Sequence, residues 1–203
     1  MIIHHVMDEV FRSWSRVAVL RVLLDTTAGF TGNQVARVSG MQPRSALKAL
    51  SSLEELGIVR RQRGGRDHLF TLNREHFLVN DALLDLYHSE RQFPEVITTT
   101  LSAMLQGKVV SAVLFGSVAK RQETPRSDLD LCCIVKSEKG KNAVRQLLDS
   151  EAQSLYKKFG VKIAPVLLTL VEAQKNAKKP LIRDIIRSSK VVAGKDWKDL
   201  PIG

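Results

Sequence analysis

We predict an α+β fold in two parts for this chain of 203 residues. Helix start and stop signals, followed by a short strand hairpin, fill about residues 10–75. The second half instead carries continuous apolar strands separated by amphipathic helices, the pattern of a small mixed sheet that is covered on both faces. The sequence Arg-Gln-Phe-Pro at residues 91–94 is a boundary signal between the two patterns. We therefore expect one domain at residues 1–90 and a second at residues 91–203.

The first part opens with helix signals. Residues 10–24 are apolar around most of a helix circumference, so we expect a largely buried helix with Trp14 as a core anchor. Thr31 and Gln34 have the spacing of a capping box, which opens a short helix that ends at Gly40.

A third helix is predicted at residues 43–56, with Pro43 at its first position. Its core stripe is Ala46, Leu47, Leu50, Leu53 and Leu56. Its opposite side carries Arg44, Ser45, Lys48 and Ser52. Residues 58–63 and 68–72 then form a hairpin, and the intervening turn makes its tip basic.

This succession of helices and a basic hairpin resembles a winged helix-turn-helix domain. The resemblance implies that the third helix enters the major groove of double-stranded DNA while the wing contacts phosphates. By this resemblance the DNA-binding residues are Arg44, Ser45 and Lys48 on the helix and Arg60, Arg61, Arg63 and Arg66 on the wing. Winged helices also serve as docking or dimerisation modules, and that alternative stays open.

An amphipathic helix is predicted at residues 74–91, with Phe77, Leu84 and Tyr87 near one face. It bridges the two halves or forms a contact between two copies of the chain. Pro94 is expected to open a separate helix that ends near residue 106, before a buried strand at residues 108–115.

The most informative stretch is residues 113–135, which is an apolar strand, a Gly-Ser turn, a polar loop and a second apolar strand. Strand side chains alternate, so Asp128 and Asp130 point to one face and are suited to Mg²⁺. Gly116 permits close approach of a ligand to the backbone, and Ser117 begins a short helix whose free N–H groups favour phosphate.

The stretch resembles the signature of the nucleotidyltransferase superfamily related to DNA polymerase beta. The resemblance implies transfer of a nucleoside monophosphate from an NTP to an acceptor hydroxyl, with Mg²⁺ as cofactor. The residues that match are Gly116 and Ser117 for nucleotide binding and Asp128 and Asp130 for metal binding and catalysis. Lys120, Arg121 or Arg126 would neutralise the leaving group.

One feature departs from that pattern. Active members of the superfamily usually carry a third carboxylate on the next strand, but the predicted strand at residues 161–170 contains no acid. Ala164 and Val166 stand where it is expected, while Glu151 and Glu172 lie on or beside helices. The chain is then an enzyme, or a transcriptional regulator or antitoxin-like protein whose second domain binds a nucleotide or a protein partner without turnover.

The remaining predictions concern the last elements and the setting of the protein. A long helix follows a loop at residues 136–141. Pro165 places strand 161–170 at an edge or at a bulge, and Trp197 carries no signal. Short helices are expected at residues 171–177 and 180–188, followed by a strand at residues 190–194.

The net charge of +10 comes mainly from residues 91–203, which hold 20 basic and 11 acidic side chains, and this excess suits nucleotide or nucleic-acid partners. Adjacent Cys132 and Cys133 face opposite sides of a strand, which argues against a disulfide between them. No membrane span or signal peptide is recognised, so we expect a cytoplasmic protein.

Overall fold

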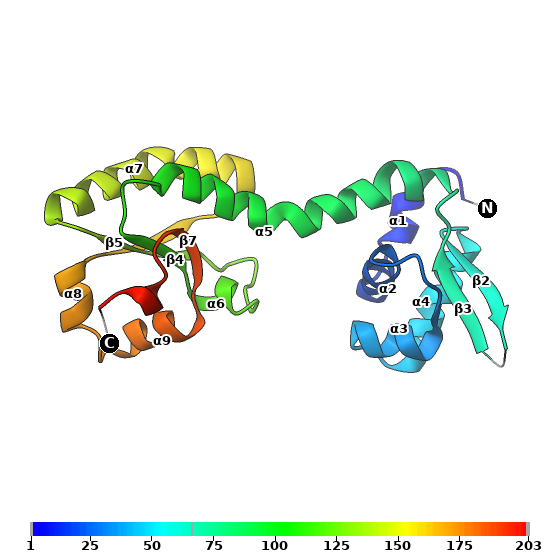
Figure 1. Ribbon diagram of the computed structural model, residues 1–203. Helices are drawn as coiled ribbons and strands as arrows, with labels where there is room; N and C mark the ends of the chain where they lie inside the picture. Colours follow the sequence, from blue (N-terminus) through cyan, green and yellow to red (C-terminus); the bar gives the residue numbers. More distant parts are fainter. Residues whose placement is uncertain (1, 66, 202–203) are drawn as a thin grey trace. The chain divides into compact units, whose positions relative to one another are not determined.

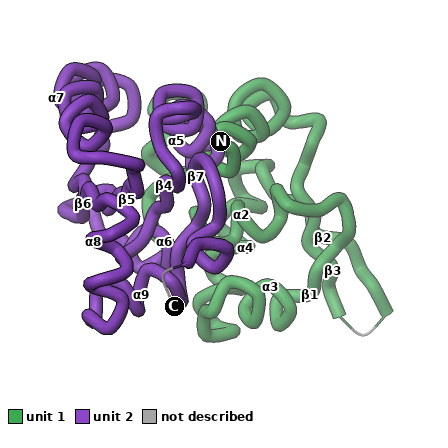
Figure 2. Tube along the Cα trace, turned by 60° about the vertical axis from the view of Figure 1, so that its left-hand side comes forward, with its two compact units in different colours: residues 1–92 green, residues 93–203 purple. Residues whose placement is uncertain are grey.

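A computed structural model describes residues 2–65 and 67–201. The predicted DNA contact Arg66 lies outside the described residues. The chain forms two compact units, residues 1–92 and 93–203, which Figure 2 shows in separate colours.

The first unit is a three-helix core with a three-stranded antiparallel sheet of order β1-β3-β2. Its elements in Figure 1 are α1 (Val6–Val10), α2 (Trp14–Leu24), β1 (Phe30–Thr31), α3 (Gly32–Ser39), α4 (Pro43–Glu55), β2 (Val59–Gly64) and β3 (Asp67–Leu72). The order helix, strand, helix, helix and hairpin is that of a winged helix-turn-helix. The capping box of Thr31 and Gln34 is present, and Gly40 ends α3 in the left-handed conformation, both as predicted.

Three sequence predictions in this unit are wrong. The helix predicted from residue 10 begins at Trp14, because Ser13 leaves the helical conformation and its hydroxyl accepts the N–H of Arg16. Trp14 lies in the first turn of α2 with 65% of its surface exposed, while deeper residues of α2 fill the core. Leu47 is 44% exposed because it lies at the side of the buried stripe of α4, over Gly32.

A long helix replaces the predicted break at Pro94. A π-helical turn, η1 (Val79–Leu83), leads into α5 (Leu84–Leu105), which continues through Pro94. Proline costs the helix one backbone hydrogen bond but already has a helical φ, and an exposed position tolerates it. Tyr87 is buried as expected, whereas Phe77 is 73% exposed and does not share its face.

The second unit is a four-stranded mixed sheet of order β6-β5-β4-β7 with helices on both faces. Its elements after α5 are β4 (Ser111–Leu114), α6 (Gly116–Ala119), β5 (Leu129–Val135), α7 (Glu138–Phe159), β6 (Ile163–Thr169), α8 (Leu170–Lys175), α9 (Pro180–Ser188), β7 (Lys190–Gly194) and η2 (Trp197–Asp199). The pair β5–β6 is parallel and the other pairs are antiparallel. The mixed sheet is confirmed, and β6 is an edge strand as Pro165 predicted.

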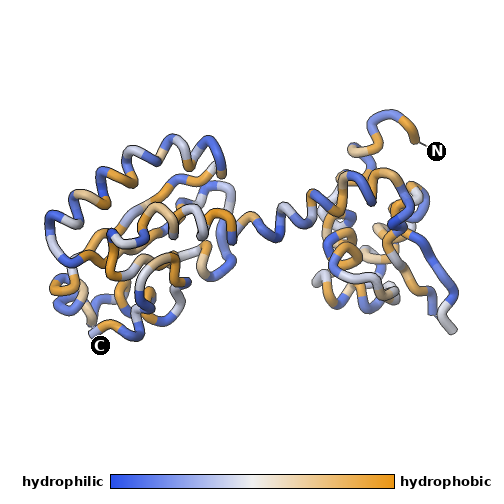
Figure 3. The backbone as a smooth tube through the Cα atoms, turned by 45° about the horizontal axis from the view of Figure 1, so that its top comes forward, coloured by the Kyte–Doolittle hydropathy of each residue, from blue (hydrophilic) through white to orange (hydrophobic). Residues whose placement is uncertain are grey.

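Two cores lie on the two faces of this sheet. One lies towards α5 and α7 and contains Cys133, while the other lies towards α8 and α9 and contains Cys132. Figure 3 shows hydrophilic and hydrophobic segments alternating along α7, as expected for a helix that packs on a sheet. Trp197, which carried no sequence signal, is 1% exposed in the second core. The polar loop predicted before α7 is shorter than expected, because Ser137 caps a helix that starts at Glu138.

No helix in residues 2–65 and 67–201 is long and apolar enough to cross a membrane.

Candidate functional site

The Gly-Ser turn lies directly against the second carboxylate of the Asp-x-Asp pair. At the end of β4, the N–H of Phe115 donates to the backbone carbonyl of Asp130 at 3.0 Å. Gly116 follows with a φ of +71°, which favours glycine. A methyl group on Gly116 would overlap with the carboxylate of Asp130, because it would lie 2.9 Å from Asp130 Cγ. Glycine is therefore required here by both its conformation and its contact.

The two carboxylates form an uncompensated negative site. Asp128 is exposed and Asp130 is half-buried at the start of β5. Burial, and secondarily the charge of Asp128, raise the pKa of Asp130 above its ordinary range. None of the ion pairs among the described residues involves either aspartate. A hard divalent cation fits such a pair of oxygen donors.

The neighbouring strand supplies no third acid. In the parallel register of β5 and β6, Asp130 pairs with Ala164 and Cys132 pairs with Val166. Within the described ranges, no group of three or more His, Cys, Asp or Glu side chains has the arrangement of a metal site. The carboxylate of Glu172 is occupied elsewhere, since it accepts from the Thr169 N–H and pairs with Lys141 at 2.7 Å. The donor set thus fits one cation better than two.

The cations near the turn fall into two groups. Lys120, at the end of α6, holds both oxygens of Asp184 on α9 at 2.8 and 2.9 Å, and this contact lowers the pKa of Asp184. Lys120 therefore anchors α6 to α9 and is less available to a leaving group than the sequence suggested. Arg121 and Arg126 are exposed on the loop between α6 and β5 and take part in none of the ion pairs of the described residues.

A second set of basic side chains lies near the turn and was not predicted from the sequence. Arg183 and Arg187 are four residues apart on α9, so they lie on one side of the helix, about 6 Å apart along its axis. Lys179, the N-cap of α9, precedes Arg183 at the same spacing. All three are exposed, and α9 contacts the helix of the Gly-Ser turn. The repeat of four in the sequence was the signal that would have found them.

The predicted DNA-binding residues lie on one exposed helix and on the wing. Arg44, Ser45 and Lys48 are all exposed on α4. On the wing, two of the predicted phosphate ligands are paired within the protein: Arg60 with Glu75 at 2.6 Å, and Arg61 with Glu54 at 3.0 Å. Surface pairs of this kind are weak, so both arginines can exchange a carboxylate for a phosphate. Arg63 is exposed on β2 opposite His68 and is free of such pairs in the described part of the chain.

Residues 97–198 match the family model described as "Polymerase beta, Nucleotidyltransferase", which spans half of the chain and includes the whole site. The chain belongs to the polymerase beta nucleotidyltransferase family. The strand, turn and Asp-x-Asp strand that suggested this family are therefore part of a domain that matches it along most of its length.

Solved structures similar to the chain are remote. NadR in complex with 4-hydroxyphenylacetate is 18% identical with a TM-score of 0.36, and the match covers 45% of this chain and 64% of that one, so the chain spans less than two thirds of it. A MarR-family transcriptional regulator from Rhodococcus sp. RHA1 is 22% identical with a TM-score of 0.33, over 43% and 67% of the two chains. A toxin-antitoxin structure with AMP-PNP is 18% identical with a TM-score of 0.33, over 53% and 77%. No curated protein matches the sequence.

Proposed function

We propose that the second unit binds a nucleoside triphosphate with Mg²⁺ at Asp128 and Asp130 and transfers its nucleoside monophosphate to an acceptor hydroxyl. The observation that carries this proposal is the contact between the Gly116 turn and the Asp130 carboxylate, which forms no ion pair with any described residue. A phosphate-binding turn and a cation-binding pair are thereby held side by side by one backbone hydrogen bond from β4 to β5.

The residues of the chain have separate tasks in this reaction. Asp128 and Asp130 hold the cation, which neutralises charge on the phosphate oxygens when it is bound. The backbone N–H groups at Gly116 and Ser117 hold the phosphates against the sheet. The acceptor oxygen bonds to the α-phosphorus and releases its proton to water. The bond from that phosphorus to the oxygen it shares with the β-phosphate breaks, and its electron pair leaves with pyrophosphate.

The exposed cations of α9 suit the departing pyrophosphate or a negatively charged acceptor. Arg183 and Arg187 are free of the ion pair that occupies Lys120, and they lie on the helix to which Lys120 is anchored. Arginine binds phosphate oxygens in a bidentate manner, so these residues are better suited to this task than the lysine.

The test is calorimetry of NTP binding with and without Mg²⁺, followed by transfer of a labelled nucleoside monophosphate on the same sample. We expect Mg²⁺-dependent binding, and the double variant Asp128→Asn, Asp130→Asn should lose that dependence, with at least a tenfold drop in affinity, because each charge-assisted contact contributes about 1.5–3 kcal/mol. Asp149→Asn, at an exposed position on α7, is the matched control. Equal NTP affinity in the double variant would remove the proposed site.

A second candidate function is regulation of transcription. The exposed face of α4 and the arginines of the wing favour binding of double-stranded DNA by the first unit, with a homodimer or another protein as partner. The missing third acid favours a form of this function in which the second unit senses a nucleotide without turnover. Transfer at an ordinary enzymatic rate would exclude the sensor, whereas Mg²⁺-dependent binding without transfer would favour it.

A further inference from the structure

A basic cavity lies in the first unit, between the start of α2 and the exposed face of α4. Its volume is about 530 Å³, in the range of small-ligand sites. Three basic side chains line it, namely Arg12 and Arg16 on the α2 side and Lys48 on the α4 side. Serine hydroxyls from both sides complete a lining in which Ala49 is the one apolar residue. Such a lining suits an anion with several oxygen acceptors.

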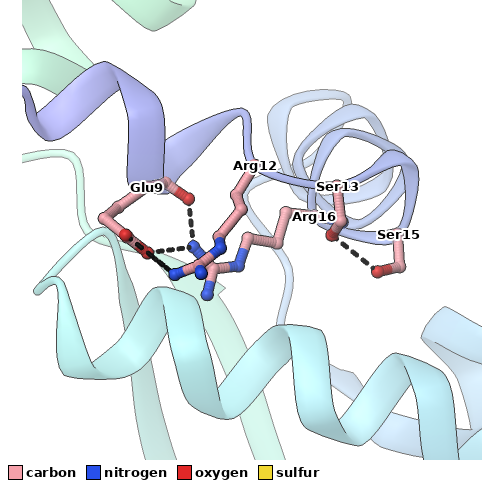
Figure 4. Close-up of polar contacts among 5 residues, drawn as sticks. All are labelled: Glu9, Arg12, Ser13, Ser15 and Arg16. Carbon is pink, nitrogen blue, oxygen red and sulfur yellow. Dashed lines mark hydrogen bonds and ion pairs between the residues drawn. The ribbon is translucent and has the colours of Figure 1, made fainter.

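An internal carboxylate already occupies part of this basic group. Arg12 Nη1 lies 2.9 Å from Glu9 Oε1, and Arg16 Nη1 lies 3.1 Å from Glu9 Oε2 (Figure 4). Arg16 also donates to the backbone carbonyl of Glu9. The two guanidinium groups, Arg16 first, lower the pKa of Glu9, so the carboxylate stays ionised. Two arginines thus share one negative charge.

The three positive charges around the cavity exceed the single negative charge of Glu9. The side chain of Arg16 is only 14% exposed, which strengthens its interaction with an anion compared with a fully hydrated group. Lys48, on the opposite wall, takes part in no ion pair among the described residues. An anion with two negative charges would balance the remaining positive charge, and its oxygens would accept hydrogen bonds from the serine hydroxyls of the lining.

We propose that this cavity binds a phosphate group, and that Glu9 on α1 competes with it for Arg12 and Arg16. The phosphate belongs either to a small phosphorylated molecule or to the backbone of bound DNA, since α4 is also the predicted DNA-reading helix. Binding would release the carboxylate of Glu9 from the two arginines, while Val10 keeps α1 anchored in the core. The proposal is independent of the nucleotidyl transfer proposed for the second unit.

The experiment measures two affinities of the full chain in metal-free buffer at constant ionic strength. One is for inorganic pyrophosphate by calorimetry, and the other is for a duplex of random sequence by gel shift. Lys48→Gln and Arg16→Gln should weaken at least one of the two affinities about tenfold, because a charged hydrogen bond is removed. Glu9→Gln should strengthen the same affinity severalfold, because the competing charge is removed. The matched controls are Lys139→Gln and Arg145→Gln, which lie on exposed positions of α7.

The outcomes separate the sources of the phosphate. An effect on pyrophosphate identifies a small ligand. An effect on the duplex alone identifies the DNA backbone when Glu9→Gln tightens duplex binding as Lys48→Gln weakens it, because Lys48 is also a predicted DNA contact of α4. Arg16 also supports the fold through Glu9, so Lys48→Gln is the decisive variant if Arg16→Gln unfolds. The proposal is overturned if Lys48→Gln matches its control in both affinities, or if Glu9→Gln strengthens neither.

Discussion

The hairpin β2–β3 and the strand pair β4–β5 are both antiparallel, and both carry charged side chains near a turn. They differ in whether those side chains have partners of opposite charge within the protein. On the hairpin, Arg60 and Arg61 each find a carboxylate of the first unit. On β5, Asp128 and Asp130 find no cation among the described residues, and the charge of Asp128 adds to the raised pKa of Asp130. Among the described residues, two arginines of the wing are thus paired within the protein, whereas the two aspartates of the sheet are not.

The paired charges of the wing and the unpaired aspartates of the sheet also differ in their interaction energies. Exposed ion pairs such as those of the wing contribute about 0–1 kcal/mol and exchange readily with phosphate. Two neighbouring carboxylates repel each other in the absence of a cation, and a bound cation would remove that repulsion. A ligand-binding function is therefore expected to depend more strongly on single residues in the second unit than in the first.

The largest effect is expected when charge is added to β6. Val166 pairs with Cys132 and is partly buried against the core, so Val166→Asp places an unpaired charge beside apolar side chains and should cost about 2–3 kcal/mol. Ala164 pairs with Asp130 itself, so Ala164→Asp should raise the Mg²⁺ or Mn²⁺ affinity and the melting temperature in Mg²⁺–NTP. Thermal melting with and without Mg²⁺–NTP compares the two variants. If Ala164→Asp gains no more stabilisation from the ligand than the wild type, the argument from the missing acid is wrong.

A smaller but specific effect is expected at the Gly-Ser turn. Gly116→Ala and Gly160→Ala both place an alanine at a positive φ, which costs about 1–2 kcal/mol. A methyl group at Gly160 meets nothing within 4 Å, whereas one at Gly116 meets Asp130. We therefore expect Gly116→Ala to lose more stability in chemical denaturation and also to lose Mg²⁺-dependent NTP binding. Equal losses of stability in the two variants would show that the contact with Asp130 is unimportant.

The charge of Asp130 should be visible in the pH dependence of stability. Its pKa is raised in the folded protein, so the unfolded chain ionises first, and the wild type loses stability as pH rises from about 4 through the folded pKa. In metal-free buffer, Asp130→Asn should therefore be more stable than the wild type near neutral pH, with the difference vanishing at low pH. Saturating Mg²⁺ should reverse the order. Melting curves between pH 3 and 7 measure this, and a difference that does not change with pH would contradict it.

The smallest effect is expected on the wing. Neutralising Arg60, Arg61, Arg63 and Arg66 should flatten the salt dependence of duplex binding by roughly 0.9 for each DNA phosphate that the wing no longer neutralises. Among the single variants, Arg63→Gln should show the full change, because Arg63 has no carboxylate partner among the described residues. Glu75→Gln frees Arg60 and should tighten binding slightly. A gel-shift titration in salt measures the slopes, and an unchanged slope in the fourfold variant would indicate a docking module instead.

Local signals predicted much of this fold. Pro180 and the short apolar run before Gly194 gave α9 and β7 with their observed bounds. Pro180 fixes a helical φ at the first position of α9, and Gly194 ends β7 with a φ of +76°. The Gly-Ser turn and the Asp-x-Asp strand were found from spacing alone. Here the backbone requirement of Gly116 and the two-residue period of a strand place the turn and the two carboxylates without any long-range information.

The misses come from contacts that no local pattern specifies. Pro94 is a strong breaker in a single sequence, but its exposure lets α5 continue through it. Trp14 and Trp197 have equal hydrophobicity, and only their positions, at the first turn of α2 and in η2 against α9, decide that one is exposed and the other buried. The pairing of Lys120 with Asp184 joins residues 64 positions apart and has no sequence signature.

The two adjacent cysteines of β5 allow the opening of this strand to be measured by thiol alkylation. Both thiols are fully buried on opposite faces of the sheet, and burial raises the pKa of Cys133 to about 12 and that of Cys132 still further. Neither thiol reacts with an alkylating reagent until the sheet opens, because the reactive species is the thiolate. The rate of alkylation therefore measures how often the strand that carries Asp130 opens. A ligand that bridges the turn and the carboxylates would slow both cysteines together, without any label or substitution in the chain.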